Sequence, residues 1–188
     1  CKDRKQGRSL NKERNDESNE ADNILVHPDV RRQLLNVRAS TEGMRALAIW
    51  TAINIDLSLE HPDEEVRERA KGMVEIMTPV VKAYCTDRGF ENVSEALQVT
   101  GGAGYTTDWC IEQYLRDARI AMIYEGTNHI QSLDLIGRKL PKGGGALYRA
   151  FSKEIYKFAK ANEEVYGMGE FATALIDAIN MLNETTMQ

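Results

Sequence analysis

Two short motifs carry the residue types that could do chemistry. Residues 101–104 read GGAG, and residues 124–127 read YEGT with Glu125 at the centre. Glycines let backbone N–H groups approach a phosphate closely, whereas a carboxylate among apolar residues can act as a general base. Each motif also has an ordinary interpretation, because glycines often end a helix and a glutamate near a helix N-terminus complements the helix dipole.

The surroundings of Glu125 leave the catalytic interpretation open beside the ordinary one, which is the more common for such a glutamate. Gly126 lets the backbone turn freely just before a predicted helix at about 127–140. The neighbouring apolar residues are Ile120, Met122, Ile123 and Tyr124. We expect them to surround the carboxylate with apolar surface, which disfavours its charged form and makes it a stronger base.

The glycine motif does not fit a Rossmann dinucleotide loop. That loop needs a preceding strand and a third glycine three residues after the second. Here Thr107 lies three residues beyond Gly104, and the preceding segment has a helical pattern. A helix stop, or a bare backbone that approaches a phosphate, therefore stays open for this segment.

Helical periodicity dominates the chain. Pro28 and Asp29 predict a helix start, and apolar residues then recur at spacings of four and three as far as Ile55 and Leu59. A second start follows at 62–65, with a kink expected at Pro79 and a stop at Gly89. The remaining predicted helices cover about 92–101 (with Asn92 and Glu95 as a capping box), 108–120, 127–140, and two segments after 141–145.

The predicted fold class is all-α, an antiparallel four-helix bundle with additional C-terminal helices. We divide the chain into the bundle at 1–140 and a helical extension at 141–188, packed on or beside it. No segment shows the alternation of a strand. The basic residues Arg4, Lys5 and Arg8 are expected on a solvated helix face.

Composition narrows the classes of protein. A net charge of −5 and a pI near 5.3 argue against nucleic-acid binding. No apolar run approaches the roughly 20 residues of a membrane span. The three cysteines, Cys1, Cys85 and Cys110, form no C-x-x-C pair and no metal-ligand spacing with histidine. Reduced thiols, a cytoplasmic location and no metal site are expected.

Taken together, the motifs resemble those of the acyl-CoA dehydrogenases. The stretch QVTGGAGY at 98–105 is similar to the family's Q-x-x-G-G-x-G-[YF] signature. Residues 115–131 are similar to its R-D-x-[RK]-I…I-Y-E-G-T-x-x-I-Q signature, and DRKQGR at 3–8 is similar to the opening of its C-terminal bundle. The extension resembles that of longer members, among them the 3-methylmercaptopropionyl-CoA dehydrogenases.

The resemblance implies an FAD-dependent enzyme that forms the α,β-double bond of an acyl-CoA thioester. By carry-over, Glu125 is the catalytic base and Thr127 contacts the flavin's phosphates. Arg4, Gln6, Gln98 and Gly102 match positions that hold the ADP portion of FAD from a neighbouring subunit, which implies a homo-oligomer. The resemblance further implies an electron-transferring flavoprotein or similar acceptor as partner.

Two alternatives stay open on the sequence: an acyl-CoA oxidase domain, and a non-catalytic helical module that mediates assembly. The family places an N-terminal helical domain and a middle β-domain before this bundle. Because the chain opens with Cys1 and lacks both, we expect a domain of a larger protein that is inactive in isolation.

Overall fold

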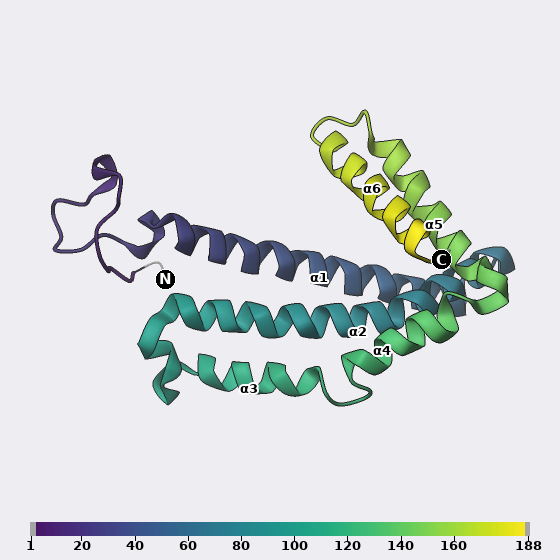
Figure 1. Ribbon diagram of the computed structural model, residues 1–188, viewed down its shortest axis with the longest axis horizontal. Coiled ribbons are helices and arrows are strands. Elements are labelled where there is room, and N and C mark those ends of the chain that lie inside the picture. Colours follow the sequence, from purple (N-terminus) through teal and green to yellow (C-terminus); the bar gives the residue numbers. More distant parts are fainter. Residues whose placement is uncertain (1–2, 187–188) are drawn as a thin grey trace. The chain divides into compact units, whose positions relative to one another are not determined.

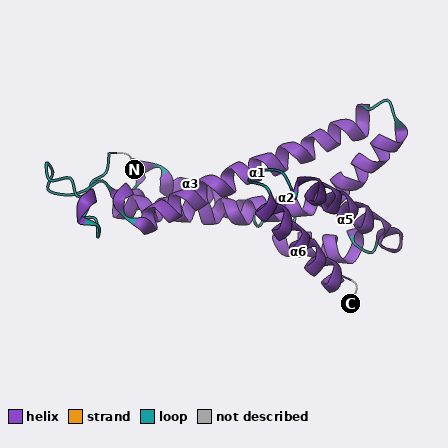
Figure 2. Ribbon diagram, turned by 90° about the horizontal axis from the view of Figure 1, so that it is seen from above, coloured by secondary structure: helices purple, strands orange, loops and turns teal. Residues whose placement is uncertain are grey.

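The computed structural model describes residues 3–186, so Cys1 lies outside the described residues. This part of the chain folds into six α-helices joined by turns and short 3-10 segments (Figure 1). No strand occurs between residues 3 and 186 (Figure 2), where a single antiparallel bridge joins Lys5 and Asn23. The all-α prediction is confirmed.

The two longest helices follow each other through a tight turn. Helix α1 spans Pro28–Glu60 and helix α2 spans Glu64–Thr100. In the turn, the Asp63 backbone N–H donates to His61 Nδ1 at 3.1 Å, and Asp63 Oδ1 accepts from the backbone N–H of Glu65 at 2.9 Å. The acidic cap satisfies a backbone donor that the first helical turn leaves without a partner. The start predicted at 62–65 is confirmed.

Helix α2 continues where the sequence predicted a break. The stop at Gly89 and the separate helix at 92–101 are wrong, because α2 runs through both to Thr100. Asn92 does not cap a helix; its Oδ1 accepts from Ser40 Oγ at 2.9 Å and its Nδ2 donates to Thr41 Oγ1 at 3.2 Å. The hydrogen bonds from Asn92 to α1 thus outweigh the low helix propensity of Gly89.

The chain divides into two compact units. The first unit, residues 1–48 and 81–127, holds an N-terminal loop, the corresponding parts of α1 and α2, and helix α3 (Ile111–Ala121). Between α2 and α3 lie the 3-10 segments η3 (Gly101–Tyr105) and η4 (Thr107–Trp109). The predicted interruption of the helix by the glycine motif is confirmed.

The second unit, residues 49–80 and 128–188, contains the remaining helices. These are α4 (Asn128–Asp134), continued by the π-helical turn η5 (Leu135–Lys139), then α5 (Lys142–Asn162) and α6 (Gly169–Thr186). Both helices of the extension were predicted.

Several contacts pack the extension within this second unit. Tyr148 Oη in α5 donates to Asn183 Oδ1 in α6 at 2.7 Å. Lys142 Nζ lies 2.5 Å from Glu75 Oε1 in α2. The extension therefore contacts α2 directly, while the boundary at residue 140 stays a prediction.

The apolar stripe of α1 was predicted correctly only in part. In its last turns the helix buries Thr51 and Asn54, whereas Ile55 and Leu59 are exposed. Asn54 tolerates burial because its Nδ2 donates to the Trp50 carbonyl at 2.9 Å. Apolar residues lie on more than one side of α1, so periodicity alone could not identify the buried face.

Gly104 provides a test of packing in the first unit. A Cβ on this buried residue would lie 1.9 Å from Thr100 Oγ1 and 2.8 Å from Thr100 Cβ. We expect Gly104→Ala to lower the free energy of unfolding by about 1–3 kcal/mol, as overpacking does. Gly89→Ala is the matched control: nothing lies within 4 Å of its added Cβ, and it should stabilise α2 by about 0.5–1 kcal/mol. Urea unfolding of both variants checks the opposite signs.

Candidate functional site

One groove in the first unit brings together four of the six predicted site residues. Arg4, Gln6, Gln98 and Gly102 all line this groove, whose volume is about 540 Å³. The N-terminal loop supplies the first two, and the end of α2 with the glycine motif supplies the others. Residues almost one hundred positions apart in the sequence therefore form one surface.

Arg4 connects the loop to the glycine motif. Its Nη1 donates to the Thr100 carbonyl at the end of α2, and its Nη2 donates to Gln6 Oε1 at 3.1 Å. A Cβ on Gly101 would lie 3.1 Å from Nη2, so the missing side chain makes room for the guanidinium. Arginine has five N–H donors, and these two bonds use two of them.

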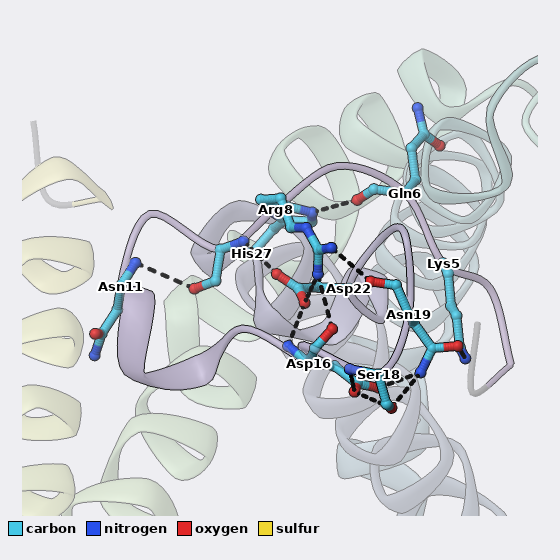
Figure 3. A network of polar contacts seen from close by, with 10 residues as sticks. Lys5, Gln6, Arg8, Asn11, Asp16, Ser18, Asn19, Asp22 and His27 are labelled. Atoms are coloured by element: carbon cyan, nitrogen blue, oxygen red, sulfur yellow. Dashed lines mark hydrogen bonds and ion pairs between the residues drawn. The ribbon is translucent and has the colours of Figure 1, made fainter.

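The loop that presents Arg4 and Gln6 is organised by a buried carboxylate, Asp22 (Figure 3). Asp22 accepts from the backbone N–H of Asp16 at 2.6 Å and of Ser9 at 2.7 Å, and from Arg8 Nη1 at 3.1 Å. These donors favour the ionised form. The backbone N–H groups of Asp16 and Ser9, more than Arg8, therefore hold the pKa of Asp22 below its usual range.

Backbone bonds pair the two arms of the loop. Gln6 N–H donates to the Asp22 carbonyl and Asp22 N–H to the Gly7 carbonyl, both at 2.8 Å. His27 Nε2 lies 2.8 Å from the Gln6 carbonyl oxygen. The helix predicted for Arg4, Lys5 and Arg8 is wrong, since these residues lie in this loop and bond to it or to α2. The expected exposure is confirmed for Lys5 and Arg8, whereas Arg4 is partly buried.

Sequence reasoning missed Asp22, Arg8 and His27 as the supports of the groove. The signal available was the density of Asp, Asn and Ser at 15–23, residue types whose side chains bond nearby backbone N–H groups. Asp16 illustrates it, with Oδ1 accepting from the Ser18 N–H at 3.1 Å. Such a run predicts a hydrogen-bonded loop rather than a helix.

Glu125 and Thr127 do not line the groove; they lie in the turn between α3 and α4. Glu125 has a φ of 54° and Gly126 a φ of 84°. A non-glycine residue in the left-handed region is uncommon and signals a constrained site. From α2, Lys82 Nζ donates to the Gly126 carbonyl at 2.7 Å.

The apolar enclosure expected around Glu125 is wrong for this chain. Glu125 is exposed, and its neighbours Ile120, Ile123 and Tyr124 keep 52%, 47% and 54% of their surface accessible. These exposed side chains therefore do not shield the carboxylate from solvent. Glu125 is thus accessible from outside the chain and flanked by an apolar surface.

Other classes of site find no support in the described part of the chain. Residues 3–186 contain no group of three His, Cys, Asp or Glu that could hold a metal ion. None of the helices there combines the length and apolar character that crossing a lipid bilayer requires. Cys85 and Cys110 are free thiols.

Comparisons with known proteins agree with the motifs. A family model described as acyl-CoA dehydrogenase, C-terminal domain, matches residues 14–140. The 3-methylmercaptopropionyl-CoA dehydrogenase of Ruegeria pomeroyi is 49% identical over 132 residues, covering 70% of this chain and 22% of that protein. The broad-specificity linear acyl-CoA dehydrogenase FadE5 of Mycobacterium tuberculosis is 38% identical over 136 residues, 72% of this chain and 22% of that protein.

A butyryl-CoA dehydrogenase of Syntrophomonas wolfei is 38% identical over 149 residues, covering 79% of this chain and 24% of that protein. The chain therefore spans about a quarter or less of the length of these curated relatives. Among solved structures, the apo form of Bd2924 matches with a TM-score of 0.60 and 23% identity, over 81% of this chain and 31% of that one. At that identity the likeness bears on the fold alone.

The Asp22 network generates a prediction about pH. Because the folded-state pKa lies below the ordinary 3.8, the stability that Asp22 contributes is fully present above that value. It disappears as the pH falls through the lowered folded-state pKa. Asp22→Asn should destabilise the chain at neutral pH, because the asparagine NH2 group is itself a donor and cannot accept from the N–H groups that now bond to Asp22.

Urea unfolding at neutral pH and in acid measures this effect. The difference in the free energy of unfolding between the wild-type chain and Asp22→Asn should become smaller in acid. Asp177→Asn, an exposed change in α6, serves as the control and should show little difference at either pH. A gap of equal size at both pH values would contradict the role of the ionised Asp22.

Proposed function

We propose that this chain, which belongs to the acyl-CoA dehydrogenase family and matches its C-terminal domain, supplies the catalytic base of an FAD-dependent dehydrogenase. The observation that carries the proposal is the turn at Glu125. There the carboxylate is accessible and is flanked by apolar side chains, on a backbone with a φ of 54°. Non-glycine residues with such a backbone are uncommon and cluster at functional sites.

In the proposed reaction, the Glu125 carboxylate removes a proton from the α-carbon of an acyl-CoA thioester. Bound FAD would supply the acceptor for the hydride that leaves the β-carbon. The backbone N–H of Glu125 would donate to the thioester oxygen as negative charge develops there. Ile120, Ile123 and Tyr124 would then contact the acyl chain or the flavin, which would remove the carboxylate from water.

The groove at Arg4 suits part of a flavin nucleotide. Its lining offers the Arg4 guanidinium, three carboxamides, the His27 imidazole and glycine backbone, beside one carboxylate, Asp29. The guanidinium and the amide donors suit a phosphate-bearing ligand rich in hydrogen-bond acceptors. Gly102 leaves open space where a side chain would stand, since nothing lies within 4 Å of a Cβ built there. We propose that Arg4, Gln6, Gln98 and Gly102 hold the ADP portion of FAD from a second subunit, and that Thr127 contacts the flavin of its own subunit.

This arrangement makes the active enzyme a homo-oligomer, with an electron-transferring flavoprotein or similar acceptor as its redox partner. Relatives are named for butyryl-CoA, linear acyl-CoA and 3-methylmercaptopropionyl-CoA. Acyl-CoA thioesters of these three kinds are therefore the first substrates to test. An oxidase would instead pass electrons to oxygen, and the yield of peroxide under air separates the two activities.

Glu125→Gln in the full-length enzyme tests the base. Glutamine keeps the size of the side chain and cannot accept the proton. We therefore expect the rate of flavin reduction by an acyl-CoA to fall by about 10²–10⁴-fold. The FAD content should stay unchanged. Anaerobic stopped-flow bleaching of the flavin measures the rate.

The control for this experiment is Glu184→Gln, an exposed change in α6. It should leave the bleaching rate as it is. Rapid bleaching in Glu125→Gln would refute the assignment of the base.

The chain by itself should bind FAD weakly and lack dehydrogenase activity. The groove is open and its donors contact only the ADP portion in our proposal, so too little of the cofactor would be enclosed. Equilibrium dialysis against FAD measures the affinity. A stoichiometric yellow flavin retained by the purified chain would contradict this expectation.

A further inference from the structure

Lys82 reaches the turn of the catalytic base from another helix. Its Nζ donates to the Gly126 carbonyl at 2.7 Å, across 44 residues of sequence, and the contact is partly buried. Gly126 directly follows Glu125. We propose, on the basis of the function proposed above, that Lys82 is a positioning residue that holds Glu125 in its catalytic conformation.

The turn requires an external support. The hydrogen bonds that continue α3 reach Tyr124, whose N–H donates to the Ile120 carbonyl at 3.1 Å, and α4 begins at Asn128. Between them, Glu125 has a positive φ, which costs a residue with a Cβ, whereas Gly126 adopts its positive φ freely. The conformation of Glu125 persists only where its surroundings over-determine it. A bond from α2 to the carbonyl at the centre of this turn meets that need.

The chemistry of lysine suits this task. An ammonium donor forms a stronger hydrogen bond to a carbonyl than a neutral donor does. The bond also polarises the peptide group between Gly126 and Thr127, which makes the Thr127 N–H a better donor. Lys82 therefore acts on both sides of Gly126: it fixes the backbone that carries Glu125, and it strengthens the donor that precedes α4.

Lys82→Met is the informative change in the full-length enzyme. Methionine has a similar unbranched apolar stem and lacks the donor, so packing on α2 is largely retained. We expect kcat to fall about 10²-fold, as a misplaced catalytic group causes. The KM for the acyl-CoA, the FAD content and the melting temperature should change little. Lys82→Arg, which returns a cationic donor, should recover part of kcat.

The matched control lies on the same helix. Lys71 is exposed, and its Nζ lies 3.6 Å from Glu68 Oε1 on the helix surface. Lys71→Met removes an ammonium from α2 as well and should leave kcat unchanged. A wild-type kcat in Lys82→Met would overturn the proposal. So would a loss of kcat that merely follows a loss of FAD and of melting temperature.

Hydrogen exchange on the 188-residue chain tests the contact without any flavin or substrate. Lys82→Met should speed amide exchange at residues 122–128, while Lys71→Met should not. Unchanged exchange there would overturn the positioning role, whatever reaction the enzyme performs. Faster exchange, combined with normal flavin bleaching in Glu125→Gln, would instead show that the turn is held but that the proposed base is wrong.

Discussion

The turn between α3 and α4 is constrained because Glu125, like Cys110 before α3, adopts a left-handed backbone conformation that residues with a Cβ seldom adopt. A φ of 54° costs such a residue on the order of 1–3 kcal/mol. Neighbouring elements have to offset that cost. Helix α3 ends in the turn through the bond from Tyr124 to Ile120, and α2 contributes the ammonium of Lys82. The glutamate is thus presented by its backbone, with its side chain left accessible.

The groove at Arg4 is built on a similar physical principle. A single buried carboxylate, Asp22, collects backbone N–H groups from an irregular loop and thereby fixes its path. A loop of this kind has no repeating ladder of hydrogen bonds, so a charged acceptor that binds several donors substitutes for one. Asp22 in the loop and Lys82 at the turn each bind backbone groups with one ionised side chain. The backbone held in this way carries the residues that we assign to ligands.

Much of the fold could be predicted, because α1, the start of α2 and the glycine interruption depend on local signals. The position of Glu125 in a turn before a helix could also be predicted, from the YEGT motif at 124–127. The continuation of α2 through Gly89 could not be predicted from nearby residues, since it depends on bonds from Asn92 to α1. The Asp22 network joins residues of irregular spacing, which produce no periodic pattern. The exposure of Glu125 depends on surfaces that no local window of sequence describes.

The unbroken helical run of α2 from Lys82 to Gln98 sets a length scale. These residues are sixteen positions apart, or roughly 24 Å at about 1.5 Å per residue. One end contacts the turn of Glu125, and the other end lines the groove that we assign to a second subunit's nucleotide. In the function proposed above, this part of α2 would be a rigid spacer between two flavins of an assembly. A single residue inserted between Lys82 and Gln98 would rotate one end of the helix by about 100° relative to the other. Insertions and deletions in this stretch should therefore disrupt the proposed arrangement.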